Sequence, residues 1–319
     1  MSEQTRLQNL PIAFFAMVMG LSGLTLVWQK AGEVLGTPAV IGRGLVFVVS
    51  ALFGVLLIAY LFKAMRHPAA VRAELDHPVK LSFFPTISIS LILIGTALRH
   101  LAPVLSLWLW ALGTALQLVL TIFIINRWMH DGHFQVVHMN PAWFIPAVGN
   151  ILVPIAGLAH GYPSISWFFF SIGVVFWVIL LTIVFYRVIF HDPLPGRLLP
   201  TLFILIAPPA AGFIAYMALV GELDTFGRIL VNIALFLTVL LVTQARRFAA
   251  LDFALSFWAY SFPLAAMTVA MMIYHELTGT PWTLWLGGIL TAATTALIAW
   301  LIVLTARAAS RGQICVAEG

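Results

Sequence analysis

The side chains best suited to chemistry are nine histidines and eleven acidic residues, and all of them lie at or beyond the ends of apolar stretches. His130, Asp131 and His133 form a short cluster, and imidazole and carboxylate groups are zinc ligands. No fourth ligand follows at helical spacing, so we expect no metal site and no cofactor. No nucleophile stands beside an acid–base pair, and no two histidines lie mid-stretch to hold a haem. The pattern therefore does not predict an enzyme.

Charged side chains are also missing from the centres of the apolar stretches. A charge at the centre of a bilayer costs a few kcal/mol or more, so a buried one usually marks a coupling site. We expect an interior without a buried acid or base. Such an interior has no carrier for a proton-coupled cycle, whereas hydroxyl groups and aromatic edges allow weakly hydrated anions to pass.

The composition places these residues in a membrane protein. Of the 319 residues, 62% are hydrophobic and 8% are charged, against about 25% charged in an ordinary soluble domain. A helix needs ~20 apolar residues to cross the hydrocarbon layer. The net charge of +5 comes from residues scattered between apolar stretches, so we expect a lipid bilayer as partner and no nucleic acid.

The apolar stretches predict an all-α integral membrane protein, a single transmembrane domain over residues 1–319 with ten spanning helices. The first stretch has no cleavage pattern after it, so we interpret it as a retained helix. The odd-numbered spans are approximately 10–29, 81–99, 142–160, 199–220 and 253–275, and the even-numbered spans are approximately 43–64, 102–126, 164–188, 226–244 and 282–306.

The basic residues predict the orientation. Twelve of the 16 fall on one side of these spans, and the other four are Lys30, Arg43, Arg99 and Arg228. Short cytoplasmic loops retain Lys and Arg, so both termini are expected in the cytoplasm.

Prolines distinguish alternate spans. They fall inside the odd-numbered spans, at Pro11, Pro85, Pro146, Pro154, Pro208, Pro209 and Pro263. A proline removes a backbone donor and kinks a helix, and the freed carbonyl must be satisfied by protein or water. The odd-numbered helices should therefore be inner ones. This predicts five helical hairpins in a quasi-five-fold arrangement around a central pore, with Pro85, Pro146, Pro209 and Pro263 as the kinking residues.

Several short sequences carry a resemblance to a known family. Residues 10–15 read LPIAFF, residues 144–148 FIPAV, residues 207–209 APP and residues 257–263 FWAYSFP. These resemble segments of the tellurite-resistance/dicarboxylate transporter family, which includes bacterial TehA-type proteins and the plant slow anion channels. The resemblance covers nearly the whole chain.

The resemblance implies a homotrimer with one pore per subunit, in a bacterial inner membrane. It also implies a pore gate at Phe262, whose position before Pro263 allows the ring to turn toward the axis. An apolar ring blocks ions by size and by denying them hydration. Further candidate pore-lining residues on the odd-numbered spans are Phe14, Phe15, Phe83, Phe84, Phe144, Phe203 and Ser261.

Two functions remain open from the sequence. The first is a channel for small monovalent anions such as chloride and nitrate. The second is a transporter of C4-dicarboxylates or an exporter of tellurite or another oxyanion. A doubly charged substrate calls for an inward-facing cation, and the candidates are Arg43, Arg99, Arg127 and Arg228.

Overall fold

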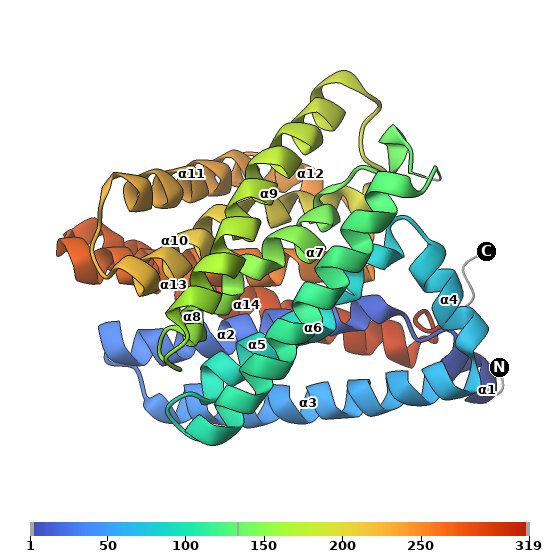
Figure 1. The fold of residues 1–319 in the computed structure, drawn as a ribbon, viewed down its shortest axis with the longest axis horizontal. Helices are drawn as coiled ribbons and strands as arrows, with labels where there is room; N and C mark the ends of the chain where they lie inside the picture. The colour runs from blue at the N-terminus through green and yellow to red at the C-terminus, as the bar shows by residue number, and fades with distance from the viewer. Residues whose placement is uncertain (1–2, 133, 317–319) are drawn as a thin grey trace.

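The computed structural model describes residues 3–132 and 134–316, and within these ranges the chain forms helices and no strands. Nine helices in the described part are long and apolar enough to cross a membrane. The predicted class, an all-α membrane protein, is confirmed. Figure 1 shows the long helices side by side, with the two termini at the same end.

Five inner segments, one for each odd-numbered span, form the centre of the bundle. They are η1 (Ile12–Phe14) with α2 (Phe15–Val34), η2 (Lys80–Phe83) with α5 (Pro85–Leu98), the broken segment Pro141–Gly157, η6 (Gly196–Ile206) with α10 (Ala207–Val220), and η7 (Leu255–Tyr260) with α13 (Ser261–Thr278). The broken segment consists of η4 (Pro141–Trp143), α7 (Phe144–Val148), η5 (Gly149–Leu152) and α8 (Val153–Gly157).

Five outer helices alternate with them along the chain: α3 (Ala39–Arg66), α6 (Pro103–His130), α9 (Pro163–Phe190), α11 (Thr225–Val242) and α14 (Pro281–Ser310). Three of these begin with a proline, which fits the first helical position because no N–H is needed there. The left-handed residues Gly221 (φ 79°) and Gly279 (φ 63°) end α10 and α13, where glycine adopts the conformation without strain.

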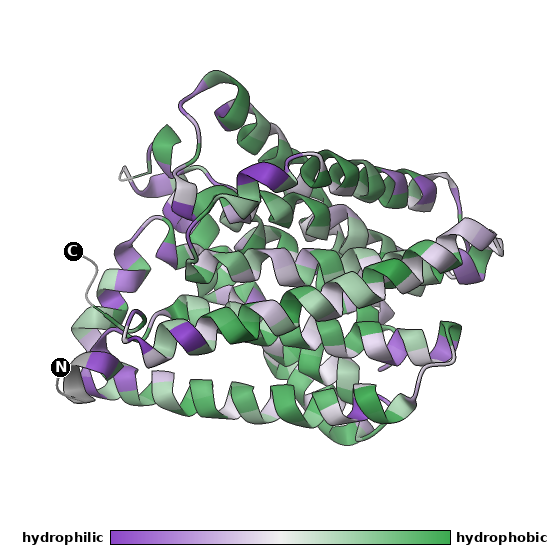
Figure 2. Ribbon diagram, turned by 180° about the vertical axis from the view of Figure 1, so that it is seen from behind, coloured by the Kyte–Doolittle hydropathy of each residue, from purple (hydrophilic) through white to green (hydrophobic). Residues whose placement is uncertain are grey.

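Burial separates the two sets. In an apolar 18-residue stretch of each long inner segment, between 67% and 83% of the residues are buried, against 22% to 39% in the same length of each outer helix. Every residue of Pro141–Gly157 except Ile155 is buried. The outer helices expose large apolar side chains such as Phe47, Trp108 and Trp285, and Figure 2 shows hydrophilic residues gathered at the helix ends. Lipid-facing surface therefore belongs to the outer helices.

The inner segments share a local feature that hydropathy did not predict: each contains a 3₁₀ stretch at its beginning, on the side of the termini. The predicted helix 142–160 differs most, because it alternates between α and 3₁₀ winding. Pro146 and Pro154 remove two backbone donors within nine residues, so a continuous α-helix cannot form there.

Short elements complete the chain outside these helices. They are α1 (Glu3–Gln8), α4 (Pro68–Asp76), η3 (Val136–His138) and α12 (Ala245–Ala249). Of these, α4 lies against both α3 and η2. It therefore connects an outer helix to the beginning of an inner one.

Glycines set the closest approaches between helices. A Cβ at Gly20 of α2 would lie 2.7 Å from the Cβ of Ser261 in α13, and one at Gly113 of α6 would lie 2.8 Å from the carbonyl oxygen of Ser88 in α5. Small residues allow this contact in membrane bundles, where dispersion rather than the hydrophobic effect holds helices together.

Candidate functional site: a central cavity and a vestibule

All five inner segments contribute to a cavity of about 190 Å³ at the centre of the bundle, which we call the central cavity. Its lining combines small and aromatic residues, including Ala13, Ala16, Phe83, Phe144, Val148, Gly149, Thr201, Pro208, Ser256, Trp258, Phe262 and Pro263. The central cavity therefore lies between helices that are far apart in the sequence.

The lining of the central cavity is uncharged. Its few polar groups are mostly engaged with the protein, because the hydroxyl of Thr201 donates to the carbonyl of Leu198 (2.5 Å) and the indole of Trp258 to Thr305 (3.0 Å). The hydroxyl of Ser256 has no protein partner in the described part of the chain. An ion here gives up water and meets no opposite charge in return.

A second cavity, of about 720 Å³, opens at the other end of the inner helices, and we call it the vestibule. Charged side chains line it, namely Lys30, Glu33, Arg43, Arg99 and Glu276, together with His100. This end of the bundle is opposite the two termini (Figure 1). The vestibule therefore differs from the central cavity in both size and charge.

Three residues line both cavities: Leu152, Ala211 and Phe262. They come from three different inner segments, η5, α10 and α13. Phe262 is the largest of the three, and 9% of its surface is exposed. We call this meeting point the neck.

The predicted pore-lining residues separate into two groups. Phe83, Phe144 and Phe262 line the central cavity, together with Pro208 and Pro263. The other five do not belong to this lining. Phe15 and Phe84 pack edge-on against Tyr60, and Phe203 packs against Phe248 and Tyr260. Ser261 faces Gly20, and Phe14 is buried outside the lining. Pro85, Pro146 and Pro209 are buried outside the lining.

Outer helix α6 stabilises the broken inner segment. The carbonyl of Pro146 accepts hydrogen bonds from the amide of Gln117 (3.0 Å) and the hydroxyl of Thr121 (2.8 Å). Gln117 also accepts from the hydroxyl of Ser88 in α5 (2.6 Å), and the amide of Asn150 donates to the carbonyl of Ala147 (2.7 Å). These buried bonds satisfy backbone groups that lipid could not.

The expectation of an interior without a buried acid or base is wrong. Lys63 and Glu74 are only 1% and 7% exposed, and Nζ of Lys63 lies 2.8 Å from Oε2 of Glu74. The hydroxyl of Tyr60 donates to the same oxygen (2.7 Å), and the backbone N–H of Ile12 donates to Oε1 (3.2 Å). The pair is buried because α4 folds back against the end of α3. Neither residue belongs to the lining of the central cavity or of the vestibule.

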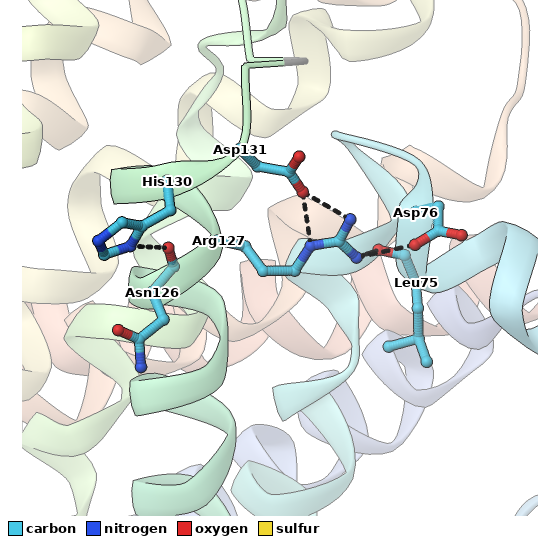
Figure 3. A network of polar contacts seen from close by, with 6 residues as sticks. All are labelled: Leu75, Asp76, Asn126, Arg127, His130 and Asp131. Atoms are coloured by element: carbon cyan, nitrogen blue, oxygen red, sulfur yellow. Dashed lines mark hydrogen bonds and ion pairs between the residues drawn. The ribbon is translucent and has the colours of Figure 1, made fainter.

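Arg127 is held in a separate network at the end of α6, as Figure 3 shows. Its guanidinium lies 2.7 Å from Asp131 and 3.0 Å from Asp76, and it also donates to the carbonyl of Leu75 (2.8 Å). The side chain therefore joins α6 to α4 and does not line either cavity.

Figure 3 also shows the ring of His130 donating to the carbonyl of Asn126 (3.0 Å). His133, the third member of the cluster considered from the sequence, lies outside the described residues. Among the described residues, no three His, Cys, Asp or Glu side chains gather as metal ligands do.

The sequence itself decides the family. A sequence model of the voltage-dependent anion channel family, SLAC1, matches residues 9–306, almost the whole chain. The chain belongs to this family. Within the SLAC1 family, the chain is 30% identical over 285 residues to the S-type anion channel SLAH2 of Arabidopsis thaliana, which covers 86% of this chain and 54% of the plant protein.

Other SLAC1-family relatives are closer in length. An uncharacterised transporter of Methanocaldococcus jannaschii is 27% identical over 86% of this chain and 88% of its own. The tellurite resistance protein TehA homolog of Haemophilus influenzae is 27% identical over 83% of this chain and 82% of its own. The chain thus spans about half the length of the plant relatives and most of the length of the two prokaryotic ones. As a SLAC1-family member it is a multi-pass membrane protein of an anion-transporting family.

Proposed function

We propose that the protein conducts small monovalent anions along the central cavity, the neck and the vestibule, with Phe262 as the gate of a closed state. The observation that carries this proposal is that Phe262 lines both cavities. The ring occupies the point where the uncharged cavity meets the charged one. An aromatic ring at a constriction blocks an ion by size and by preventing hydration.

The uncharged lining supports a particular selectivity. Without a charged binding site in the central cavity or at the neck, the free energy of dehydration ranks the anions. Nitrate and iodide should therefore pass more readily than chloride. Reversal potentials in mixed chloride and nitrate gradients measure this order, and a flat or reversed series would count against the proposal.

The gate is tested by Phe262→Ala in planar bilayers containing purified protein. We expect chloride conductance to rise, because the substitution removes the apolar ring from the neck. Phe83→Ala is the matched control, since Phe83 lines the central cavity but not the vestibule. An unchanged conductance in Phe262→Ala, or an equal rise in both variants, would mean that Phe262 is a packing residue.

A second candidate function is the transport of a C4-dicarboxylate or an oxyanion. Arg43 and Arg99 reach the vestibule, as a doubly charged substrate requires. The similarity to a tellurite resistance protein also favours this class. Saturable uptake of labelled malate or tellurite into proteoliposomes would support it, and the absence of saturation would favour the channel.

Location and assembly complete the proposal. We infer a homotrimer with one path per subunit, in a bacterial inner membrane with both termini in the cytoplasm. The shared end of the two termini supports the orientation (Figure 1), as does the excess of Lys and Arg in the loops at that end. Native mass spectrometry measures the subunit number, and labelling of Cys315 in intact cells reports the side of the C-terminus.

A further inference from the structure

The charges of the vestibule do not balance. Nζ of Lys30 lies 2.9 Å from Glu33 and 2.6 Å from Glu276. One ammonium group thus engages both carboxylates of this cavity. Arg43 and Arg99 also line the vestibule, and in the described part of the chain neither guanidinium pairs with a carboxylate.

The two arginines come from different parts of the fold. Arg43 lies near the beginning of outer helix α3, and Arg99 lies directly after inner helix α5. The guanidinium of Arg99 lies 2.9 Å from Nε2 of His100. A guanidinium has donors only, so the imidazole nitrogen is the acceptor in this contact. Among the described residues no other side-chain hydrogen bond engages either guanidinium, so their remaining donors can meet an anion.

This excess positive charge belongs to the lining of the vestibule and is absent from the lining of the central cavity. The vestibule shares Leu152, Ala211 and Phe262 with the central cavity, whose own lining is uncharged. An anion attracted by Arg43 and Arg99 would therefore be held in the vestibule, outside the uncharged central cavity. Strong binding inside a path would slow conduction, because an ion must also be able to leave.

We propose that Arg43 and Arg99 form a capture site for small inorganic anions in the vestibule. The site raises the local anion concentration at the neck. This inference rests on the proposed function, because the capture site feeds the path closed by Phe262. It adds a binding step whose strength depends on ionic strength, since salt screens charges at a solvent-filled opening.

Screening sets the size of the expected effect. The Debye length is about 30 Å at 10 mM salt, longer than the distance across such a cavity, and about 3 Å at 1 M. Two charges about 10 Å from an ion in water change its local concentration by roughly threefold to fourfold without screening. The contribution of the two arginines to the local anion concentration should vanish at 1 M salt.

The test uses Arg43→Gln/Arg99→Gln in a Phe262→Ala parent, so that current flows in both proteins. Single-channel chloride conductance is measured in phosphatidylcholine bilayers between 10 mM and 1 M potassium chloride. We expect the double substitution to lower conductance about threefold at 10 mM, with no difference at 1 M. Arg228→Gln in the same parent is the matched control, because Arg228 is an exposed arginine outside the vestibule lining and should leave conductance unchanged.

Each outcome separates the two proposals. If the Phe262→Ala parent conducts and the double substitution has no effect, or lowers conductance equally at all salt concentrations, the capture site is refuted and the channel stands. If the parent passes no current, the gated channel fails. The capture site is then tested by soaking crystals of the unsubstituted protein in bromide and locating the bound ions by anomalous diffraction. Anomalous density beside both guanidinium groups supports the site, and its absence there refutes it.

Discussion

Neutralising Glu74 tests the energetics of the buried ion pair directly. In Glu74→Gln, the Lys63 ammonium loses its charged partner and keeps the carbonyl of Leu10 (2.7 Å) as its acceptor. Leaving one partner of a buried pair uncompensated costs about 3–5 kcal/mol. Lys63 lies three residues before the end of α3, so its long side chain can reach toward water and relieve part of the cost. We expect a loss of about 3 kcal/mol.

The assay is the thermal midpoint of detergent-purified protein, followed by size-exclusion chromatography. At about 2–4 °C per kcal/mol, the midpoint should fall by roughly 6 °C or more. The double variant Lys63→Met/Glu74→Gln should recover most of this loss, because it also removes the ammonium group that the single variant leaves buried without a charged partner. A shift below about 2 °C in the single variant, or a double variant less stable than the single one, would refute the reasoning.

Two further predictions concern packing and pH. Gly20→Ala should destabilise the protein by about 1–3 kcal/mol, because the added methyl group overlaps α13. Gly44→Ala is the control and should not destabilise it, since nothing lies within 4 Å of a Cβ at Gly44. Equal thermal midpoints for the two variants would contradict this prediction. The hydrogen bond from the Gly227 N–H to Asp224 lowers the pKa of that carboxyl below 3.8 in the folded protein. Its stabilising contribution is therefore present above pH 3.8 and is lost as the pH falls through the lower folded value, so the stability difference between wild type and Asp224→Asn should shrink in that acid range.

The bundle architecture was predictable because two strong signals agree. Hydropathy marks the spans, and prolines such as Pro85 and Pro209 mark the segments that must avoid lipid. Both residues are buried in the structure. The physical reason is general: a proline in a membrane helix leaves a backbone carbonyl to be satisfied, and lipid offers no donor.

The Lys63–Glu74 pair was not predictable in the same way. Its only signal was a lysine inside the apolar stretch 43–64, followed by an acid in the short polar helix after it. Burial of both groups depends on how α4 folds back against α3. That arrangement is tertiary and leaves no local pattern.

Adjacent phenylalanines mark another limit of the sequence. Phe83 lines the central cavity, whereas its neighbour Phe84 packs against Tyr60. Successive residues turn by about 100° in an α-helix and about 120° in a 3₁₀ helix. The direction of a side chain therefore depends on where 3₁₀ winding gives way to α winding. Here the change falls between Phe83, the last residue of η2, and Pro85, the first residue of α5. Phe203 lies within 3₁₀ segment η6 and was subject to the same ambiguity.

The 3₁₀ winding of η7 has a mechanical consequence for the ring that follows it. Six residues, Leu255–Tyr260, precede α13, and Phe262 is the second residue of that helix. Rewinding six residues from 3₁₀ to α changes the rotation by about 20° and the rise by about 0.5 Å for each residue. The sum is a screw movement of about 120° and 3 Å. A change of winding in this one short segment would thus turn Phe262 about the helix axis, together with the first turn of α13 that carries it.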